Sequence, residues 1–573
     1  MKSLSLSWRL LFLTFAAFLA GCGPSSSPAP ATPQSQNHSP QATPKPVGGG
    51  AIELVFTYGS EKEEWIKDVT TAFNASGAKT SGGKSISVKA IPMGSGDCVD
   101  EILAGARQPH LISPASAVFI KLGNAQARQK TGKDLIGHTD NLVLSPVVIA
   151  MWKPMAEALG WPAKPVGWSD ILTLAQKPDG WASVGKPQWG PFRFGHTHPQ
   201  FSNSGIISVL AEVYAGAGKV NNLTLEDVQS PKVADYLRGI EQSVVHYGSS
   251  TGFFGKKMFS GGVRFLSAAV LYESSVIESY SSKEPLEFPV VAIYPKEGTF
   301  WSDHPVGIVD REWVTAEHKE AAQAYITYLL DRPQQEKAIQ YGFRPALVEI
   351  PIVAPIDTAH GVDPKEPRTT LEVPSTEVVD AILALWVKNK KHSNITLVLD
   401  TSGSMNAEKR MENARLGALT LLGTLSDEDH FGLLPFSTKP IWMGQAVPLK
   451  NGRAEAESNI KGLIADGGTV LYDSIAEAYD KMLAQRATNK GKIDALVVLT
   501  DGADNKSSIS LDTLIEKIKF DHENKTIRVF VIGYGNDVEK DKLKKIAEAT
   551  HAKYYDGNPK NIRQVFRDIS TFF

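Results

Sequence analysis

The feature that most constrains this chain is a run of oxygen-bearing residues, Asp400-Thr401-Ser402-Gly403-Ser404, placed directly after an apolar segment. Residues 395–399 have the pattern of a buried parallel strand, and residues 410–425 have that of a helix. Open α/β sheets hold their ligand sites on the loops at the carboxyl ends of such strands. Asp400, Ser402 and Ser404 alternate, so their oxygens can converge on a curled loop, and oxygen ligands suit a hard cation such as Mg²⁺ or Mn²⁺.

Two later loops add further oxygen ligands. Gly467-Gly468-Thr469 precedes a helical pattern at 471–486, and Thr500-Asp501-Gly502 follows a second buried-strand pattern at 494–499. An isolated Asp-x-Ser-x-Ser could be a cluster of helix N-caps. Three elements in order, each at a strand–loop–helix junction, indicate a metal site instead.

Together the three motifs resemble the metal-ion-dependent adhesion site of the von Willebrand factor A family, and the likeness extends from about residue 393 to the C-terminus. The resemblance implies that Asp400, Ser402, Ser404, Thr469 and Asp501 bind Mg²⁺, with Mn²⁺ or Ca²⁺ as alternatives. These five groups do not close an octahedron without water or an oxygen from outside the protein. The resemblance assigns the remaining place to an Asp or Glu of a partner protein.

The C-terminal region alternates strand and helix patterns, which predicts a doubly wound, Rossmann-like α/β domain with helices on both faces of a mostly parallel sheet. A short antiparallel edge strand is expected within 441–448. The expected elements are 395–399, 410–425, 430–436, 454–464, 471–486, 493–500, 511–520, 527–533, 540–549 and 560–572.

The N-terminal residues have the pattern of a secretory signal. Lys2 and Arg9 flank a polar start, and the apolar run at 10–20 is too short to cross a bilayer comfortably. It ends in Leu19-Ala20-Gly21-Cys22, which resembles a bacterial lipobox. We therefore expect a lipoprotein signal peptide at 1–21, a lipidated Cys22 and a location in the cell envelope, facing the periplasm or the exterior. The Pro- and Ser-rich stretch 22–50 is expected to be a disordered tether.

Residues 51–350 resemble the two-lobed periplasmic solute-binding proteins of ABC transporters. The resemblance rests on the segments at 145–161, 192–205, 269–278, 293–299 and 341–345. It implies a second lobe at about 150–285, entered through 142–151 and left through 288–294. A Pro-rich strap and a connecting helix, capped by Ser375 or Thr376, are expected to fill 351–392.

Glycines and hydroxyls recur where the helices of this module should start, and free N–H groups there can hold polar or anionic ligands. Plain helix capping explains the same pattern. On position alone, the expected cleft residues for a small polar solute are Ser60, Ser95, Ser113, Asn203, Ser204, Tyr272 and Glu273.

Other signals exclude more than they indicate. A formal net charge of −2 without a long basic tract argues against a nucleic-acid partner. His196-Thr197-His198 suggests a metal pair, but the sequence shows no third ligand nearby, so a role in capping or in contacting a polar ligand is favoured. Cys98 has no evident His partner, and there is no Gly-x-Ser-x-Gly nucleophile elbow.

Three functions fit these features. The first is an envelope adhesion protein that binds a protein partner through the metal and a solute through the cleft. The second is the receptor of an ABC transporter with an accessory A domain. The third, a metal-dependent enzyme, is disfavoured because no general base or nucleophile accompanies the metal motif. We therefore expect no catalytic residues.

Overall fold

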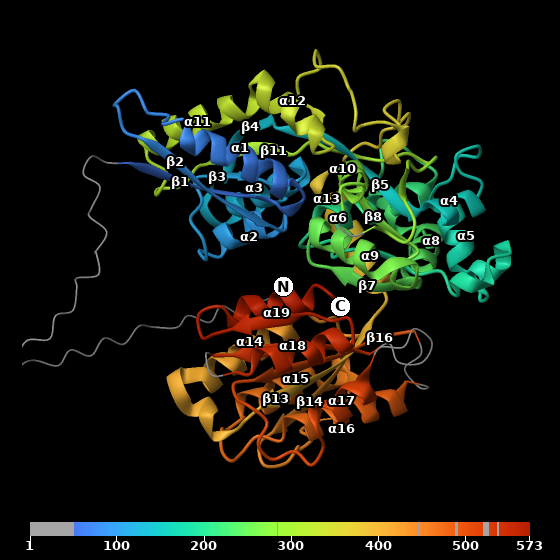
Figure 1. Ribbon diagram of the computed structural model, residues 1–573, viewed down its shortest axis with the longest axis vertical. Coiled ribbons are helices and arrows are strands. Elements are labelled where there is room, and N and C mark those ends of the chain that lie inside the picture. The colour runs from blue at the N-terminus through green and yellow to red at the C-terminus, as the bar shows by residue number, and fades with distance from the viewer. Residues whose placement is uncertain (1–50, 283–284, 445, 487–490, 520–526, 536–537) are drawn as a thin grey trace, which may run out of the picture. The chain divides into compact units, whose positions relative to one another are not determined.

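The computed structural model describes residues 51–282, 285–444, 446–486, 491–519, 527–535 and 538–573. The expected signal peptide, Cys22 and the tether lie outside these residues. Three sheets with covering helices make up the described chain (Figure 1), so the mixed α/β class expected from the sequence is confirmed. Among the described helices, none has both the length and the apolar character that a membrane span requires.

The first sheet forms one lobe of the N-terminal module. Its strand order is β2-β1-β3-β11-β4, with β1 parallel to β2 and β3, and β11 antiparallel to its neighbours. The core behind it contains Trp65, Phe73 and Tyr325, all buried. Its elements are β1 (Ile52–Gly59), α1 (Glu63–Ala75), β2 (Ile86–Met93), α2 (Asp97–Leu103), β3 (Leu111–Ser113), α3 (Ala117–Thr131), β4 (Ile136–Asn141), β11 (Pro305–Val309), α11 (Ala316–Leu330) and α12 (Arg332–Gln340).

The second sheet forms the other lobe, and the long strand β5 (Val143–Trp152) runs through it. Its path is β10-β5-β8-β6-β7, and β9 and β12 also pair with β5. Its strands are β6 (Phe194–Thr197), β7 (Val244–Gly248), β8 (Ala268–Tyr272), β9 (Val290–Ile293), β10 (Trp301–Ser302) and β12 (Arg344–Pro345). Its helices are α4 (Lys153–Ala158), α5 (Trp168–Ala175), α6 (Asn203–Ala217), α7 (Leu225–Gln229), α8 (Pro231–Glu241), α9 (Thr251–Phe265) and α10 (Glu273–Ser279).

A connecting segment follows, in which the Pro-rich residues contain only short turns before α13 (Thr376–Asn389) begins. Ser375 caps this helix, because its hydroxyl accepts a hydrogen bond from the Val378 N–H at 3.4 Å. Trp386 of α13 is buried and contacts Tyr247 and His198 edge-on. The helix therefore packs on the second lobe rather than standing in solvent.

The third sheet has the order β15-β14-β13-β16-β17-β18 and is parallel except for β15. β15 lies within the expected edge strand and is two residues long. The strands are β13 (Ser393–Asp400), β14 (His430–Phe436), β15 (Val447–Pro448), β16 (Ile493–Thr500), β17 (Arg528–Tyr534) and β18 (Tyr554–Gly557). The helices are α14 (Arg410–Thr424), α15 (Leu449–Lys461), α16 (Leu471–Gln485), α17 (Leu511–Ile518), α18 (Lys540–Ala549) and α19 (Ile562–Ser570).

Helices cover both faces of this third sheet. Successive residues of β13 point to opposite faces, and each face packs against a helix. Leu397 belongs to the core that contains Phe566 of α19, and Val398 belongs to the core that contains Ile475 of α16. All eight residues of β13 are buried. Parallel strands covered on both faces hold their carboxyl ends in fixed positions, which is where the candidate metal ligands lie.

Candidate metal centre and solute cavity

The metal loops meet at the carboxyl ends of β13 and β16, which are parallel neighbours with Leu399 opposite Leu499. Asp400 follows there, and both of its carboxylate oxygens accept hydrogen bonds. The Ser402 N–H donates to Oδ1 at 2.8 Å, and the Thr500 hydroxyl donates to Oδ2 at 2.6 Å. The strand register and these two donors fix the orientation of the Asp400 carboxylate.

Hydroxyl groups connect this loop to Asp501. Ser402 Oγ lies 3.0 Å from Ser404 Oγ, and the Ser404 hydroxyl donates to Asp501 Oδ1 at 2.6 Å. Asp400 and Asp501 are 101 positions apart in sequence, and together with Ser402 and Ser404 they form one connected group.

The loop that carries Thr469 is joined to the same place by backbone hydrogen bonds. The Asp466 N–H donates to the Thr401 carbonyl at 2.7 Å, and the Gly403 N–H donates to the Gly467 carbonyl at 3.1 Å. Gly467 has a φ of +87°, which favours glycine at this turn. A methyl group on Gly502 would lie 3.9 Å from the Thr469 hydroxyl oxygen, so that hydroxyl faces the Asp501 loop.

Arg410, which no motif in the sequence singles out, also contacts this group. Its Nη1 donates to Asp501 Oδ2 at 3.0 Å, and the side chain is 9% exposed. Gly535, with a φ of +107°, leaves room for the guanidinium, because a Cβ there would lie 3.2 Å from Arg410 Cζ. As the first residue of a predicted helix, an arginine is ordinarily expected in solvent, so only the fold reveals this contact.

Burial and charge make this group suitable for a cation. Burial raises the pKa of Asp400 to about 6; its hydrogen bonds with Ser402 and Thr500 lower it, and the charge of Asp501 raises it. Two buried carboxylates thus share the site with one guanidinium. All five expected ligands offer oxygen, so the residues fit Mg²⁺, Mn²⁺ or Ca²⁺. Ser404 is exposed whereas Asp400 is fully buried, so the group is open to solvent at Ser404.

The residues expected in the solute cleft lie mostly inside the protein. Ser60 lines a cavity, whereas the other six are buried in internal contacts. Glu273 accepts two hydrogen bonds from Arg344, at 2.8 and 2.6 Å. Asn203 Nδ2 donates to the Tyr272 hydroxyl at 3.0 Å. The remaining contacts are Ser95 Oγ with Ala115 N at 2.9 Å, Ser113 Oγ with His304 O at 3.5 Å, and Ser204 Oγ with Thr197 and Thr251 hydroxyls at 2.8 and 2.9 Å.

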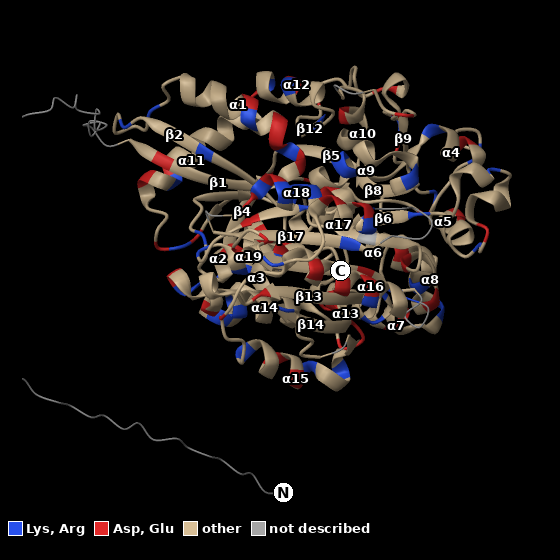
Figure 2. Cartoon of the chain, turned by 60° about the horizontal axis from the view of Figure 1, so that its bottom comes forward, with Lys and Arg blue, Asp and Glu red and all other residues tan. Residues whose placement is uncertain are grey.

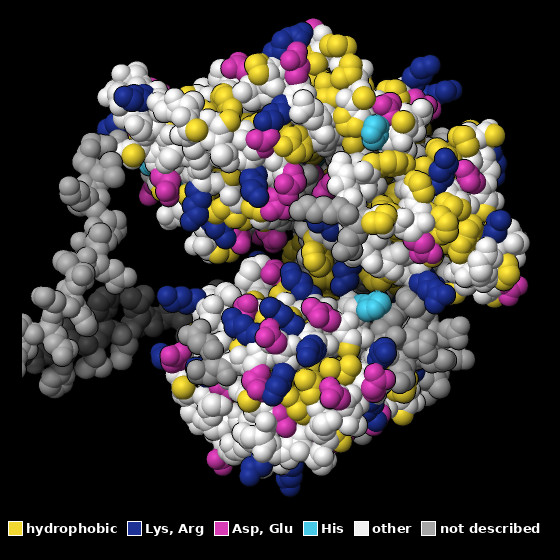
Figure 3. Space-filling model, viewed as in Figure 1, with side chains coloured by type: hydrophobic (Ala, Val, Ile, Leu, Met, Phe, Trp, Pro, Cys, Tyr) yellow, Lys and Arg dark blue, Asp and Glu magenta, His cyan; other side chains and the backbone are white. Residues whose placement is uncertain are grey.

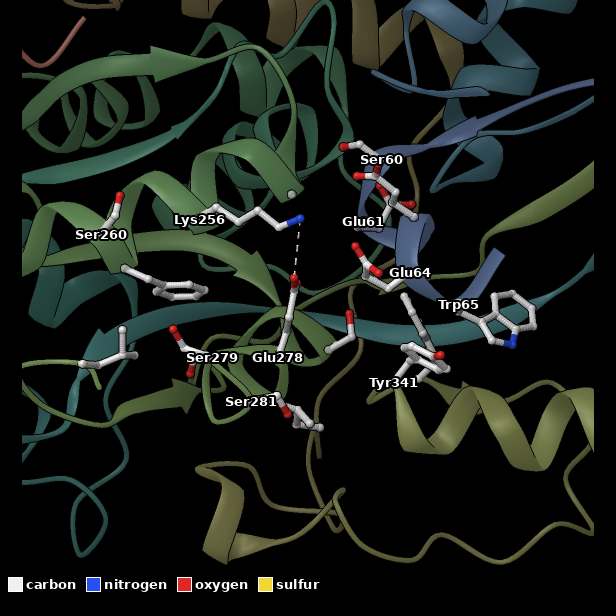
Figure 4. Close-up of a pocket in the computed structure, with 18 of the residues that line it drawn as sticks. Ser60, Glu61, Glu64, Trp65, Lys256, Ser260, Glu278, Ser279, Ser281 and Tyr341 are labelled. Atoms are coloured by element: carbon white, nitrogen blue, oxygen red, sulfur yellow. Dashed lines mark ion pairs between the residues drawn. The ribbon is translucent and has the colours of Figure 1, made fainter. Parts of the chain in front are cut away.

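The cavity that Ser60 lines has a volume of about 940 Å³. One wall comes from the β1–α1 junction and the opposite wall from α9 and α10, so the cavity separates elements of the two lobes (Figure 4). The lining includes aromatic rings and one lysine among five glutamates. The side chains that decide its charge and shape are Glu61, Glu63, Glu64, Glu278, Glu287, Lys256, Trp65, Phe259, Tyr341 and Phe343.

The charges in this cavity are only partly compensated. Lys256 pairs with Glu278 at 3.8 Å, as the dashed line in Figure 4 shows. Glu61 is 3% exposed and pairs with Lys62 at 2.6 Å and with His304 at 3.2 Å. Burial raises the pKa of Glu278, the charge of Lys256 lowers it, and those of Glu64 and Glu63 raise it. The lining therefore carries a local excess of negative charge. Elsewhere both signs are interspersed, along the chain and on the face drawn in Figure 3 (Figures 2 and 3).

Two family models match the chain. Residues 54–344 match the bacterial extracellular solute-binding protein model, and residues 394–568 match the von Willebrand factor type A domain model. The first range contains both walls of the cavity, and the second contains all five expected metal ligands.

Individual proteins are similar to different parts of the chain. An uncharacterized protein of Mycobacterium tuberculosis (strain ATCC 25618 / H37Rv) is 21% identical over 543 residues, covering 90% of this chain and 76% of that protein. Inter-alpha-trypsin inhibitor heavy chain H2 of Homo sapiens is 26% identical over 190 residues, covering 31% of this chain and 20% of that one. A solved periplasmic thiamin binding protein is similar over 60% of this chain and 98% of its own, with 13% identity and a TM-score of 0.43.

Proposed function

Because this chain belongs to the family of bacterial extracellular solute-binding proteins and carries a C-terminal von Willebrand factor type A domain, we propose that it is a cell-envelope binding protein. Its A domain binds a partner protein through a divalent cation, and its two-lobed module binds a small solute. The observation that carries the first part is the convergence of Asp400, Ser402, Ser404 and Asp501 at a point open to the surface.

Each residue of the metal centre has a role in this proposal. Asp400 and Asp501 supply charge, and Ser402, Ser404 and Thr469 supply neutral oxygens. The bound cation would supply Lewis acidity toward an incoming carboxylate of the partner, an Asp or Glu side chain. Arg410 already offsets part of the Asp501 charge. Metal affinity without a partner should therefore be modest, and partner binding should strengthen it, because the two binding events are thermodynamically linked.

Capture from envelope extracts tests this part. The full chain serves as bait in Mg²⁺ and in EDTA, beside Asp400→Ala and the control Asp512→Ala, which removes an exposed carboxylate from α17. The proposal expects one set of proteins retained in Mg²⁺ by wild type and by Asp512→Ala, and lost in EDTA or with Asp400→Ala. Equal retention by all three baits in Mg²⁺ would contradict it.

The second part concerns the solute. The excess of carboxylates over the single Lys256 favours a small polar solute that carries an amine or another cationic group, with the aromatic side chains covering its apolar part. This charge argues against the anionic solute that helix N-termini would favour. Thermal-shift screening of amines, neutral sugars and dicarboxylates at low salt tests the choice. A shift with dicarboxylates and none with amines would contradict it.

We also propose that Cys22 is lipidated and anchors the folded part through the 22–50 tether. The support is the lipobox after a short apolar run. Cys22→Ser should move the protein from the membrane to the soluble fraction. An unchanged membrane fraction would place the anchor elsewhere.

A transport receptor is the second candidate, and the two-lobed fold with its interlobe cavity favours it. In that case the A domain is accessory and the cavity delivers its solute to a permease. Co-purification of a permease with wild type and with Asp400→Ala alike would favour this role over adhesion.

A further inference from the structure

A second cluster of ligand-type side chains lies inside the second lobe, away from the cavity and the metal loops. His196 of β6, Glu212 of α6 and Glu241 at the end of α8 are each fully buried (elements labelled in Figure 2). One ligand atom from each lies within 4.8 Å of the others. From the sequence, a capping or polar role was favoured over a metal pair of His196 and His198. The structure instead joins His196 to two carboxylates from distant helices.

Hydrogen bonding fixes the protonation of His196. Its Nδ1 lies 2.7 Å from the Thr197 carbonyl oxygen, which can only accept, so Nδ1 carries a hydrogen. Nε2 faces Glu241 Oε1 at 3.0 Å. When the ring is neutral with its hydrogen on Nδ1, His196 Nε2 and Glu241 Oε1 both present lone pairs to each other. A proton or a metal ion must therefore lie between these two atoms. An imidazole that donates one N–H to a backbone carbonyl is the usual arrangement around a metal-binding histidine.

Each of the two carboxylates likewise accepts a hydrogen bond from a neighbouring hydroxyl. The Tyr247 hydroxyl donates to Glu241 Oε2 at 2.6 Å, and the Ser208 hydroxyl donates to Glu212 Oε1 at 2.8 Å. Glu212 Oε2 is buried and, within the described residues, has no hydrogen-bond partner. Each carboxylate thus has one oxygen occupied by a hydroxyl and leaves the other for the centre of the cluster.

The charge of the cluster is also incomplete. In the described part of the chain, His196 is the one basic side chain paired with either carboxylate. Two carboxylates in a dry interior cost several kcal/mol unless a cation or protons compensate them. One imidazole nitrogen and two carboxylate oxygens form a donor set that suits borderline divalent ions, which bond these atoms at about 2.0–2.2 Å.

We propose that His196, Glu212 and Glu241 hold one buried divalent cation, Zn²⁺ or Mn²⁺, which ties β6, α6 and α8 together. Its role is structural, because the three ligands are closed to solvent. The ion enters as the lobe folds and afterwards resists chelators, whereas the surface-open centre at Asp400 exchanges freely. This difference separates the two sites experimentally.

The test refolds the full chain from denaturant with Zn²⁺, with Mn²⁺ or with EDTA, washes all samples with EDTA and measures metal by mass spectrometry. Wild type and the control Glu157→Gln, an exposed glutamate of α4, should keep about one equivalent of metal. Glu212→Gln, which conserves shape, should lose it and melt several degrees lower than wild type when both are folded with metal. Asp400→Ala should keep the retained ion, since it alters the other centre.

The alternative is a cluster held by shared protons. Glu212 would then already be neutral, and Glu212→Gln would have the same melting temperature as wild type in every sample. Neither protein would retain metal. That result overturns the proposal. If Glu212→Gln does not fold, X-ray absorption of EDTA-washed wild type decides. An imidazole in the shell of the retained metal supports the site, and an all-oxygen shell or no retained metal overturns it.

Discussion

The metal centre and the solute cavity use carboxylates in opposite ways. At the metal centre Asp400 is fully buried and each of its oxygens accepts a hydrogen bond from a neighbouring strand end or loop. In the cavity Glu64 and Glu287 are exposed, and Lys256 and Glu278 are 3.8 Å apart. At the metal centre the sheet fixes the positions of the ligand oxygens before any cation binds. The cavity is instead lined by longer side chains that come from two lobes.

This difference has consequences for recognition. A preorganised site gains affinity from each fixed oxygen and loses most of it when one charged ligand is removed. A cavity lined by several glutamates spreads its attraction over several groups, so single changes have graded effects. Variants at the two sites should therefore differ in the size of their effects.

Asp400→Ala should reduce Mn²⁺ affinity of the full chain roughly a thousandfold, about 4 kcal/mol, because it removes a buried charged ligand. Isothermal titration calorimetry measures the loss, and Asp512→Ala serves as the control. In EDTA the variant should melt close to wild type, since removing a loop carboxylate opens no core cavity. A far lower melting temperature in EDTA would mean that the Asp400 loop is a structural feature.

Acidification should destabilise the N-terminal module around His304, which lies against Glu61 and Lys62. His304 is fully buried, and burial together with the charge of Lys62 lowers its pKa to about 4. The unfolded chain therefore binds a proton between pH 6.5 and 4 that the folded chain does not bind. The contribution of His304 to the free energy of unfolding is fully present above pH 6.5. It should fall by up to about 3 kcal/mol as the pH drops to 4.

Denaturant titrations of wild type and His304→Gln between pH 7 and 4 measure this effect. The variant should lose less stability over the interval. Burial raises the pKa of Glu61, but Lys62 and His304 lower it to about 2 overall. Protonation of Glu61 therefore adds a further loss of stability below pH 4.5. Parallel curves for both proteins between pH 6.5 and 4.5 would show that His304 is not the titrating group.

Glu278→Gln should weaken binding of an amine solute about tenfold and leave binding of Mn²⁺ unchanged. The magnitude corresponds to one partly solvated charge interaction of about 1.4 kcal/mol. Glu157→Gln is the matched control. A complete loss of solute binding would show that the cavity is as preorganised as the metal centre and would remove the contrast.

Thr469→Ala should weaken Mn²⁺ binding about three- to tenfold, because it removes one neutral oxygen and no charge. Titration at constant pH against Asp400→Ala ranks the two ligands. An effect of Thr469→Ala equal to that of Asp400→Ala would mean that the loop at Gly467 controls access to the centre.

How far the sequence predicted these sites depends on whether their residues belong to local motifs that the sheet topology brings together. The strand and loop motifs at 400–404, 467–469 and 500–502 predicted both the doubly wound sheet and the group that the structure assembles, because parallel strands bring their carboxyl ends to one edge. Arg410 was missed, since its burial depends on Gly535 and Asp501, which lie far from it in sequence.

The two-lobed module shows the other limit. Its fold followed from an extended resemblance, but a serine at a predicted helix start satisfies a neighbour as readily as a solute. Ser95 contacts Ala115, and Glu273 is neutralised by Arg344, 71 positions away. His196 likewise meets Glu241 across 45 positions. Periodicity within a segment does not specify such tertiary pairs.

Anomalous diffraction from crystals of the full chain grown with Mn²⁺ would locate the proposed cation beside Asp400. We predict a manganese peak bounded by Asp400, Ser402, Ser404, Thr469 and Asp501, directly or through water, with an open position toward solvent beside Ser404. A map without a peak there, in which Arg410 and Ser404 still occupy the Asp501 carboxylate, would contradict it.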